Sequence, residues 1–147
     1  MLYFAYGSNM NHKQMKSRCP SSKFIKKGYI EGYKFVYDGF SSCRGGGTAN
    51  IVKEKGSIVW GGIFDINPDN LAVLDCYEGY PKSYDRKEMS VNDDKGGIFR
   101  AIVYFRVGKS LTPPNETYRE IVIQGAKDCG LPEEYTKSNL YRKIIKI

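Results

Sequence analysis

The sequence has little of the chemistry that metal sites and disulfide frameworks need. It contains one histidine, His12, and four cysteines that are scattered along the 147 residues without any C-x-x-C pair. Zinc sites usually draw on clusters of these two residue types, so the pattern gives no support to a metal site. Scattered thiols are typical of proteins in a reducing compartment, and we therefore expect a cytoplasmic location.

Long apolar runs are missing as well. The sequence has no stretch of 18 apolar residues and no basic segment ahead of the apolar run at its N-terminus. We therefore expect a soluble protein with no membrane span and no signal peptide. The length favours one domain over residues 1–147. A hydrophobic content of 41%, with 14% aromatic residues, argues against a disordered chain.

The charge is unbalanced, with 23 basic and 16 acidic side chains and a net charge of +7. An excess of this sign suits nucleic acids or acidic ligands. The dense basic clusters are Lys23-Lys26-Lys27 and Arg142-Lys143-Lys146, and no nucleic-acid motif accompanies them. We expect a solvated basic surface and no nucleic-acid partner.

Hydrophobic periodicity predicts about six strands and three to four helices. The expected strands are 2–6, 28–37, 48–52, 57–66, 84–91 and 98–107, and the expected helices are 11–18, 68–77, 116–129 and 133–140. The fold class is therefore α+β or mixed α/β, with a small curled mixed sheet or partial barrel and flanking helices. The polar segment 38–47 is expected to be a loop that can act as a mobile flap. The pair Gly61-Gly62 predicts a bulge, a sharp bend or the close approach of another backbone.

The first ten residues combine a buried strand with a turn and a helix start. Leu2–Tyr6 is apolar and aromatic, Gly7 suits a tight turn, and Ser8 and Asn9 are helix N-cap residues. Such a turn points several backbone N–H groups at one spot, where the helix dipole also favours negative charge. A carboxylate or a developing oxyanion would fit there. An ordinary strand-to-helix turn is the alternative interpretation.

A second candidate lies at the end of the helix expected over 68–77. Gly79 and Pro81 cannot continue a helix, so Glu78 sits at the helix end or in the loop after it. A carboxyl group held between an apolar helix and an aromatic strand can be partly desolvated, which raises its pKa and suits it to general acid/base catalysis. The alternative is an ordinary surface glutamate.

Together these two motifs resemble the gamma-glutamylcyclotransferase family. The resemblance rests on Tyr3-Phe4-Ala5-Tyr6-Gly7-Ser8-Asn9 joined to Leu74-Asp75-Cys76-Tyr77-Glu78-Gly79. It extends in order over nearly the whole chain, through Gly47-Thr48-Ala49-Asn50-Ile51, Val59-Trp60-Gly61, Tyr118, Gln124-Gly125-Ala126-Lys127 and Gly130-Leu131-Pro132-Glu133-Glu134-Tyr135.

The resemblance implies a small barrel-like α/β fold and a reaction that needs no cofactor and no metal. In that reaction a gamma-glutamyl amino acid or amine cyclises to 5-oxoproline and releases the amino acid or amine. It also implies a homodimer. Matching positions make Glu78 the general acid/base, and they give the substrate-binding residues as Tyr3, Phe4, Ala5, Tyr6, Gly7, Ser8, Asn9, Tyr84 and Tyr118.

Three alternatives stay open from the sequence. The resemblance makes Tyr3–Ser8 the glutamyl-binding segment. The leaving group lies outside this segment, so a gamma-glutamylamine or another gamma-glutamyl metabolite is an alternative substrate. A non-catalytic module that binds a small ligand in the same pocket is the second. The third is a cysteine-dependent hydrolase that pairs His12 with Cys19 or Cys43, although no third orienting residue is evident. We favour His12 as a surface residue of its helix.

Overall fold

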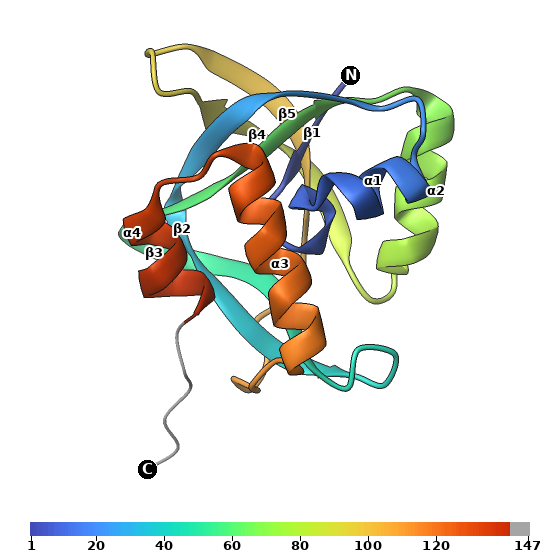
Figure 1. The fold of residues 1–147 in the computed structure, drawn as a ribbon, viewed down its shortest axis with the longest axis vertical. Coiled ribbons are helices and arrows are strands. Elements are labelled where there is room, and N and C mark those ends of the chain that lie inside the picture. The colour runs from blue at the N-terminus through green and yellow to red at the C-terminus, as the bar shows by residue number, and fades with distance from the viewer. Residues whose placement is uncertain (142–147) are drawn as a thin grey trace.

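The structure, a computed structural model that describes residues 1–141, is built around a closed five-stranded barrel (Figure 1). The strand order is β1-β3-β2-β4-β5, and only the closing β1–β5 pair is parallel. The strands are β1 (Leu2–Ala5), β2 (Lys23–Ser41), β3 (Gly46–Asp65), β4 (Asp85–Asn92) and β5 (Ile98–Phe105). The barrel confirms the expected fold class. The basic cluster Arg142-Lys143-Lys146 lies outside the described residues.

The strand count differs from the expected six because β3 is continuous. Its register against β2 steps from Glu31↔Ile58 to Tyr33↔Lys53, so residues 54–57 of β3 lie opposite the single residue Gly32, and β3 has three extra residues at that point. The turn-like residues 53–56 therefore form an irregularity within a long strand and do not separate two strands. Pairing with β2 decides this outcome, and such pairing is not visible in the local sequence.

The prediction of a loop over residues 38–47 is wrong for most of these residues. Strand β2 continues to Ser41 and β3 begins at Gly46, so only the hairpin tip 42–45 lies outside the sheet. Asp38 is fully buried there, and its carboxylate accepts hydrogen bonds from Asn50, Arg106 and the backbone of Lys109. A charged side chain can be buried because it is paired and fully hydrogen-bonded in this way.

The helices lie close to the expected ranges, except that the last one ends at Tyr135 and is followed by a π-helical turn. They are α1 (His12–Arg18), α2 (Pro68–Glu78), α3 (Glu116–Cys129) and α4 (Glu133–Tyr135), with a 3-10 turn, η1 (Ser8–Met10), and a π-helical turn, η2 (Thr136–Leu140). In Figure 1, α1 and α2 lie beside each other at one end of the barrel, while α3 crosses its face. None of these helices within residues 1–141 is long and apolar enough to cross a membrane.

One predicted cap is wrong. Ser8 and Asn9 form the 3-10 turn, and Asn11 caps α1 by accepting a hydrogen bond from the Gln14 backbone N–H at 3.0 Å. The side chains of Ser8 and Asn9 are instead used by Gln14, whose Nε2 donates to both of them. The helix therefore begins later than predicted, and the residues before it are free to line the space beside it.

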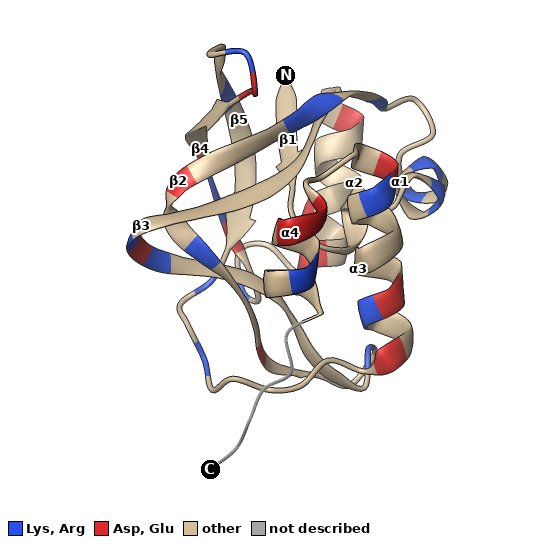
Figure 2. Ribbon diagram, turned by 60° about the vertical axis from the view of Figure 1, so that its left-hand side comes forward, with Lys and Arg blue, Asp and Glu red and all other residues tan. Residues whose placement is uncertain are grey.

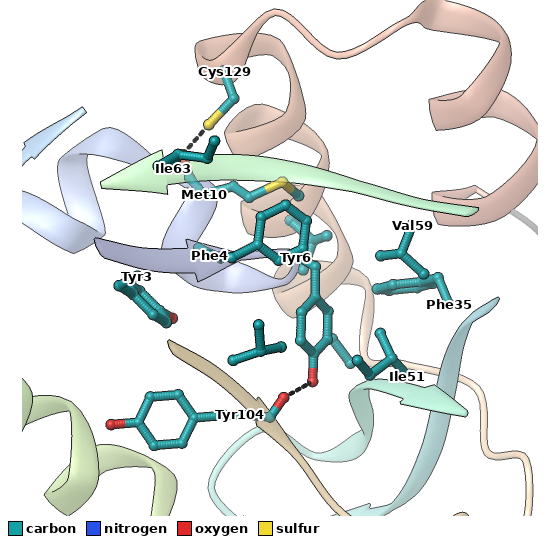
Figure 3. Close-up of a cluster of buried hydrophobic side chains, with 14 of the residues drawn as sticks. Tyr3, Phe4, Tyr6, Met10, Phe35, Ile51, Val59, Ile63, Tyr104 and Cys129 are labelled. Carbon is teal, nitrogen blue, oxygen red and sulfur yellow. Dashed lines mark hydrogen bonds between the residues drawn. The ribbon is translucent and has the colours of Figure 1, made fainter. Parts of the chain in front are cut away.

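The barrel interior is unusually rich in tyrosine for a buried core. Figure 3 shows Tyr3, Phe4 and Tyr6 of the N-terminal segment packed with Tyr104 and with aliphatic side chains of the long strands. Tyr6 Oη donates a hydrogen bond of 2.7 Å to the Tyr104 carbonyl oxygen. Buried tyrosine hydroxyls need partners of this kind, so the hydrogen bond fixes the start of the chain against β5.

Basic and acidic residues are interspersed along the ribbon (Figure 2). Two lysines of the first basic cluster have acidic partners at the β4–β5 hairpin: Lys26 Nζ lies 3.0 Å from Asp93 Oδ2, and Lys27 Nζ lies 3.6 Å from Asp94 Oδ2. Part of the local positive charge that the sequence indicated is therefore balanced within the fold.

The pair Gly61-Gly62 serves the close approach of another backbone. Neither glycine carries a bulge, since Gly28↔Gly61 and Lys27↔Gly62 are consecutive pairs. A Cβ atom at Gly61 would overlap the carbonyl oxygen of Ala5 and would lie 2.7 Å from the Phe4 ring. Glycine at this position therefore lets β1 lie against β3.

We predict that Gly61→Ala lowers the free energy of unfolding by about 1–3 kcal/mol, because the added methyl must push β1 away from its place. Urea denaturation of the two proteins measures the difference. Gly108→Ala is the matched control, since the position is exposed and its nearest neighbour is a Val52 methyl at 3.2 Å. Equal stability of Gly61→Ala and the parent protein would contradict the assigned contact.

Candidate active site

A cavity of about 780 Å³ opens where the residues after β1, the end of α2 and the β2–β3 hairpin meet. Tyrosines and arginines dominate its wall. The lining residues are Tyr3, Phe4, Tyr6, Gly7, Ser8, Asn9, Gln14, Arg18, Phe40, Ser41, Ser42, Cys43, Arg44, Thr48, Ala49, Cys76, Tyr77, Glu78, Gly79, Ser83, Tyr84, Tyr104, Arg106 and Tyr118. They come from segments far apart in the sequence, as expected for a site assembled by the barrel.

Glu78 is the last residue of α2 and points into this cavity. The helix ends there because Gly79 adopts a left-handed conformation, with φ of +66°, and its N–H returns to the Asp75 and Cys76 carbonyls. Asp75, one turn earlier, accepts hydrogen bonds from Arg86 Nε at 2.8 Å and from Tyr104 Oη at 2.6 Å. These contacts attach the end of α2 to β4 and β5, so the position of Glu78 is rigidly set.

The environment of Glu78 suits a group that exchanges protons near neutral pH. Burial raises the pKa of its carboxyl group to about 7, against the opposing effect of Arg18, Arg106 and Arg44. Among residues 1–141, no hydrogen bond to this carboxyl group contributes to the shift of its pKa. Its proton-accepting oxygens are therefore available to a ligand in the cavity.

Two of the arginines are held firmly by the protein. Arg18 donates to Asn9 Oδ1 at 3.1 Å and lies 3.9 Å from the centre of the Tyr77 ring. Arg106 donates from Nη2 to the carboxylate of Asp38 at 2.6 Å and also lies over the Tyr84 ring. The charge of Arg106 is thus balanced by a buried acid.

Arg44 extends from the hairpin tip and is held differently. Its Nη2 donates to Gln14 Oε1 at 3.1 Å, and its guanidinium lies 5.2 Å from the centre of the Tyr118 ring. Gln14 in turn donates to Ser8 Oγ and to Asn9 Oδ1, both at 2.9 Å. A chain of hydrogen bonds therefore links the hairpin tip to the turn after β1.

Eight of the nine predicted binding residues line the cavity, together with Glu78. They are Tyr3, Phe4, Tyr6, Gly7, Ser8, Asn9, Tyr84 and Tyr118. Ala5 is the exception, because it is buried within β1 and pairs with Gly62 of β3. The structure places Ala5 behind the cavity wall, where it supports the strand.

The predicted aromatic residues are locked into the wall by their hydroxyl groups. Tyr118 Oη accepts a hydrogen bond from the Ala49 N–H at 2.9 Å, and Tyr84 Oη donates to the Ala49 carbonyl at 2.7 Å. Gly7 lies against the same residue, since a Cβ there would be 2.8 Å from the Ala49 Cβ. Ala49 on β3 therefore holds three of the predicted binding residues at one place.

The residues that sequence reasoning missed are polar side chains from distant segments. They are Gln14, Arg18, Arg44, Thr48, Tyr104 and Arg106. Arg44 lies in the segment 38–47 that the sequence indicated as a possible flap, and Thr48 lies in the motif Gly47-Thr48-Ala49-Asn50-Ile51 of the family resemblance. The others fall within ordinary helix or strand patterns, and nothing local distinguishes them from solvent-facing residues.

The alternative cysteine site is not assembled as the sequence suggested. His12 Nε2 lies 3.7 Å from Cys129 Sγ, and the ring packs 4.7 Å from Phe24, so His12 is half-buried against an aromatic cluster and is not a plain surface residue. Burial raises the pKa of the Cys129 thiol to about 12, which disfavours a reactive thiolate. Within residues 1–141, no group of three or more potential ligands could hold a metal ion.

The geometry can now be set beside known proteins. The sequence model of the AIG2-like family matches residues 58–138. Gamma-glutamylcyclotransferase of Bos taurus is 33% identical over 141 residues, which cover 92% of this chain and 75% of that protein. The Homo sapiens protein of the same name is 33% identical over 139 residues, covering 91% and 74%. A solved gamma-glutamyl cyclotransferase structure has a TM-score of 0.92 at 30% identity, covering 99% of this chain and 89% of its own.

A closed barrel with a carboxyl group at a helix end, facing a cavity of small-molecule size, defines an enzyme of the AIG2-like class. The chain belongs to the gamma-glutamylcyclotransferase family, as its motifs predicted.

We predict that Glu78→Gln stabilises the fold above neutral pH. Because the pKa of Glu78 is raised in the folded state, the folded chain binds a proton more tightly than the unfolded chain, and stability falls as the pH rises from 4.5 to 7. The neutral amide avoids this loss. The gain at pH 8 should be about 3 kcal/mol, with none at pH 4, measured by urea denaturation. Glu134→Gln, at an exposed position, is the control.

Proposed function

We propose that this protein converts an L-gamma-glutamyl amino acid to 5-oxoproline and a free amino acid, with Glu78 as the general acid/base. The observation that carries the proposal is one desolvated carboxyl group, with a pKa of about 7, in a cavity that Tyr6, Gly7 and Ser8 also line. The family relationship supports the same assignment. A cytoplasmic location and a homodimer remain predictions.

The substrate supplies its own nucleophile. Its α-amine attacks the γ-carbonyl carbon, so the protein needs no nucleophilic serine or cysteine. Glu78 accepts a proton from the amine, and a new C–N bond closes the five-membered ring. A wall of ordered tyrosines can hold the glutamyl chain folded, so that the amine meets the carbonyl, which removes an entropic barrier.

The attack places negative charge on the γ-carbonyl oxygen. Backbone N–H groups at Tyr6, Gly7 and Ser8 are the proposed donors to this oxyanion, and one such donor is worth about 3 kcal/mol in other enzymes. Glu78 then returns the proton to the leaving nitrogen, and the original amide C–N bond breaks. The intermediate collapses to 5-oxoproline and the released amino acid, with Glu78 again ionised.

We predict that Glu78→Gln lowers kcat by about 10²- to 10⁴-fold, because the amide can neither accept nor return the proton. The assay measures 5-oxoproline release from a panel of L-gamma-glutamyl dipeptides, gamma-glutamyl-ε-lysine and glutathione. The variant should still fold and bind substrate, as checked by circular dichroism and calorimetry. Undiminished turnover, with the substitution confirmed by mass, would refute the assignment of Glu78.

The pH dependence gives a separate prediction. Since Glu78 must be ionised to act as the base, kcat/KM should rise with pH through about 7. Arg18 is the strongest of the cations that lower the pKa of this carboxyl group. In Arg18→Gln the rise should move to higher pH by about one unit. A profile that does not move would show that another group sets it. Lys13→Gln, at an exposed site outside the cavity wall, controls for net charge.

A further inference from the structure

The proposed function leaves open what recognises the part of the substrate beyond the scissile amide. The leaving amino acid of a gamma-glutamyl dipeptide carries its own carboxylate, whereas the amine leaving from a gamma-glutamylamine does not. Three arginines, Arg18, Arg44 and Arg106, line the cavity. Within the described residues 1–141, Glu78 is the one Asp or Glu side chain that lines it. This imbalance favours a ligand with more than one negative charge.

The arginines differ in how far their charges are already satisfied. Arg106 is paired with the buried Asp38 and also donates to Thr48 Oγ1 at 3.0 Å, so its guanidinium is committed to the protein. Arg18 donates to Asn9, next to the predicted glutamyl-binding segment Tyr3–Ser8, and it has the strongest effect of the three arginines on the pKa of Glu78, so we assign it to the glutamyl end of the cavity.

Arg44, like Arg18, has N–H donors to spare, but it lies at the β2–β3 hairpin tip. Within residues 1–141 its guanidinium makes one hydrogen bond, to the neutral amide oxygen of Gln14, and no ion pair. An arginine presents five N–H donors in a planar fork that matches a carboxylate. Its weaker effect on Glu78 than that of Arg18 or Arg106 agrees with a position farther from the reacting carboxyl group.

The surroundings of Arg44 hold that fork in one orientation. The Tyr118 ring lies beneath the guanidinium, the Arg44 backbone N–H donates to Ser41 Oγ at 3.1 Å, and Gln14 holds one edge. Exposed residues Ser42, Cys43 and Gly45 flank it at the hairpin tip, so it lies at the outer part of the cavity wall. A ligand whose glutamyl end occupies the Tyr3–Asn9 loop would extend its far end toward this position.

We propose that Arg44 is a specificity-determining residue that binds the carboxylate of the leaving amino acid. The proposal rests on the proposed function, since it concerns the same cavity and the same substrate. It assigns to Arg44 the choice of a gamma-glutamyl amino acid over a gamma-glutamylamine or an amide-capped dipeptide.

The test compares L-gamma-glutamyl-L-alanine with its C-terminal amide, which is nearly identical in shape but lacks the carboxylate charge. The parent protein should prefer the acid. Arg44→Gln should lower kcat/KM for the acid by about 10- to 100-fold, mainly by raising KM. For the amide, kcat/KM should stay within about twofold of the parent value. Arg44→Lys should keep part of the preference, because it keeps the charge and loses the planar fork.

Two outcomes overturn the role of Arg44 and leave the cyclotransferase proposal standing. One is an equal fall in kcat/KM for the acid and the amide in Arg44→Gln, which would indicate a structural role. The other is an undiminished preference for the acid in Arg44→Gln. Lys13→Gln removes one positive charge outside the cavity wall and should change neither substrate, which separates local recognition from the net charge of the protein.

Binding measurements distinguish failure of the Arg44 proposal from failure of the proposed function. Calorimetry of both peptides against Glu78→Gln, with and without Arg44→Gln, measures recognition without turnover. If no protein releases 5-oxoproline but the acid binds more tightly and loses this advantage in the double variant, the chemistry is wrong and the role of Arg44 stands. Equal affinity of the two peptides for Glu78→Gln would refute the role of Arg44.

Discussion

Closure of the barrel by a strand of four residues is the constraint on which the site depends. Strand β1 pairs with β3 along its whole length and with β5 through one parallel pair, Tyr3↔Ile102. It fits there because Gly61 has no side chain to keep it away from β3. The chain leaves the barrel directly after Ala5, so the turn that follows must enter the cavity. Strand pairing, and not the helix start expected from Ser8 and Asn9, therefore brings Tyr6–Asn9 to the cavity wall.

The second constraint is electrostatic. Burial alone would push the pKa of Glu78 further up, and the nearby arginines bring it back to about 7. The balance needs Glu78 to stay at a fixed depth, and Asp75 provides this by tying α2 to Arg86 of β4 and Tyr104 of β5. The tyrosines of the wall add hydroxyl groups that are already hydrogen-bonded to the backbone, so they shape the cavity without adding charge. A polar, ordered wall of this kind suits a small zwitterionic substrate.

The sequence predicted the elements that local chemistry controls. Helix α3 has the predicted bounds because Asn115 caps one end and Gly130 closes the other, and Glu78 was placed correctly because Gly79 ends α2. Contacts between distant residues were not predictable. The union of two expected strands into β3 depends on pairing with β2. The arginines were missed for the same reason, since Arg44 meets a partner 30 residues away and Arg106 one 68 residues away. The family resemblance indicated eight residues that line the cavity, but it could not show that Ala5 lies behind the wall.

The two constraints together suggest how substrate charge and base strength are coupled. The arginines lower the pKa of Glu78 and so weaken it as a base. Under the proposed function, a bound substrate brings carboxylates to Arg18 and Arg44 and offsets their positive charge. The arginines then stabilise the ionised Glu78 less, and water is displaced from its surroundings, so its pKa rises on binding. A carboxyl group that is ionised before binding thus becomes a stronger proton acceptor once the amine lies beside it. A ligand without the second carboxylate would leave the charge of Arg44 in place and gain less of this effect. Binding and catalysis would therefore favour the same substrate.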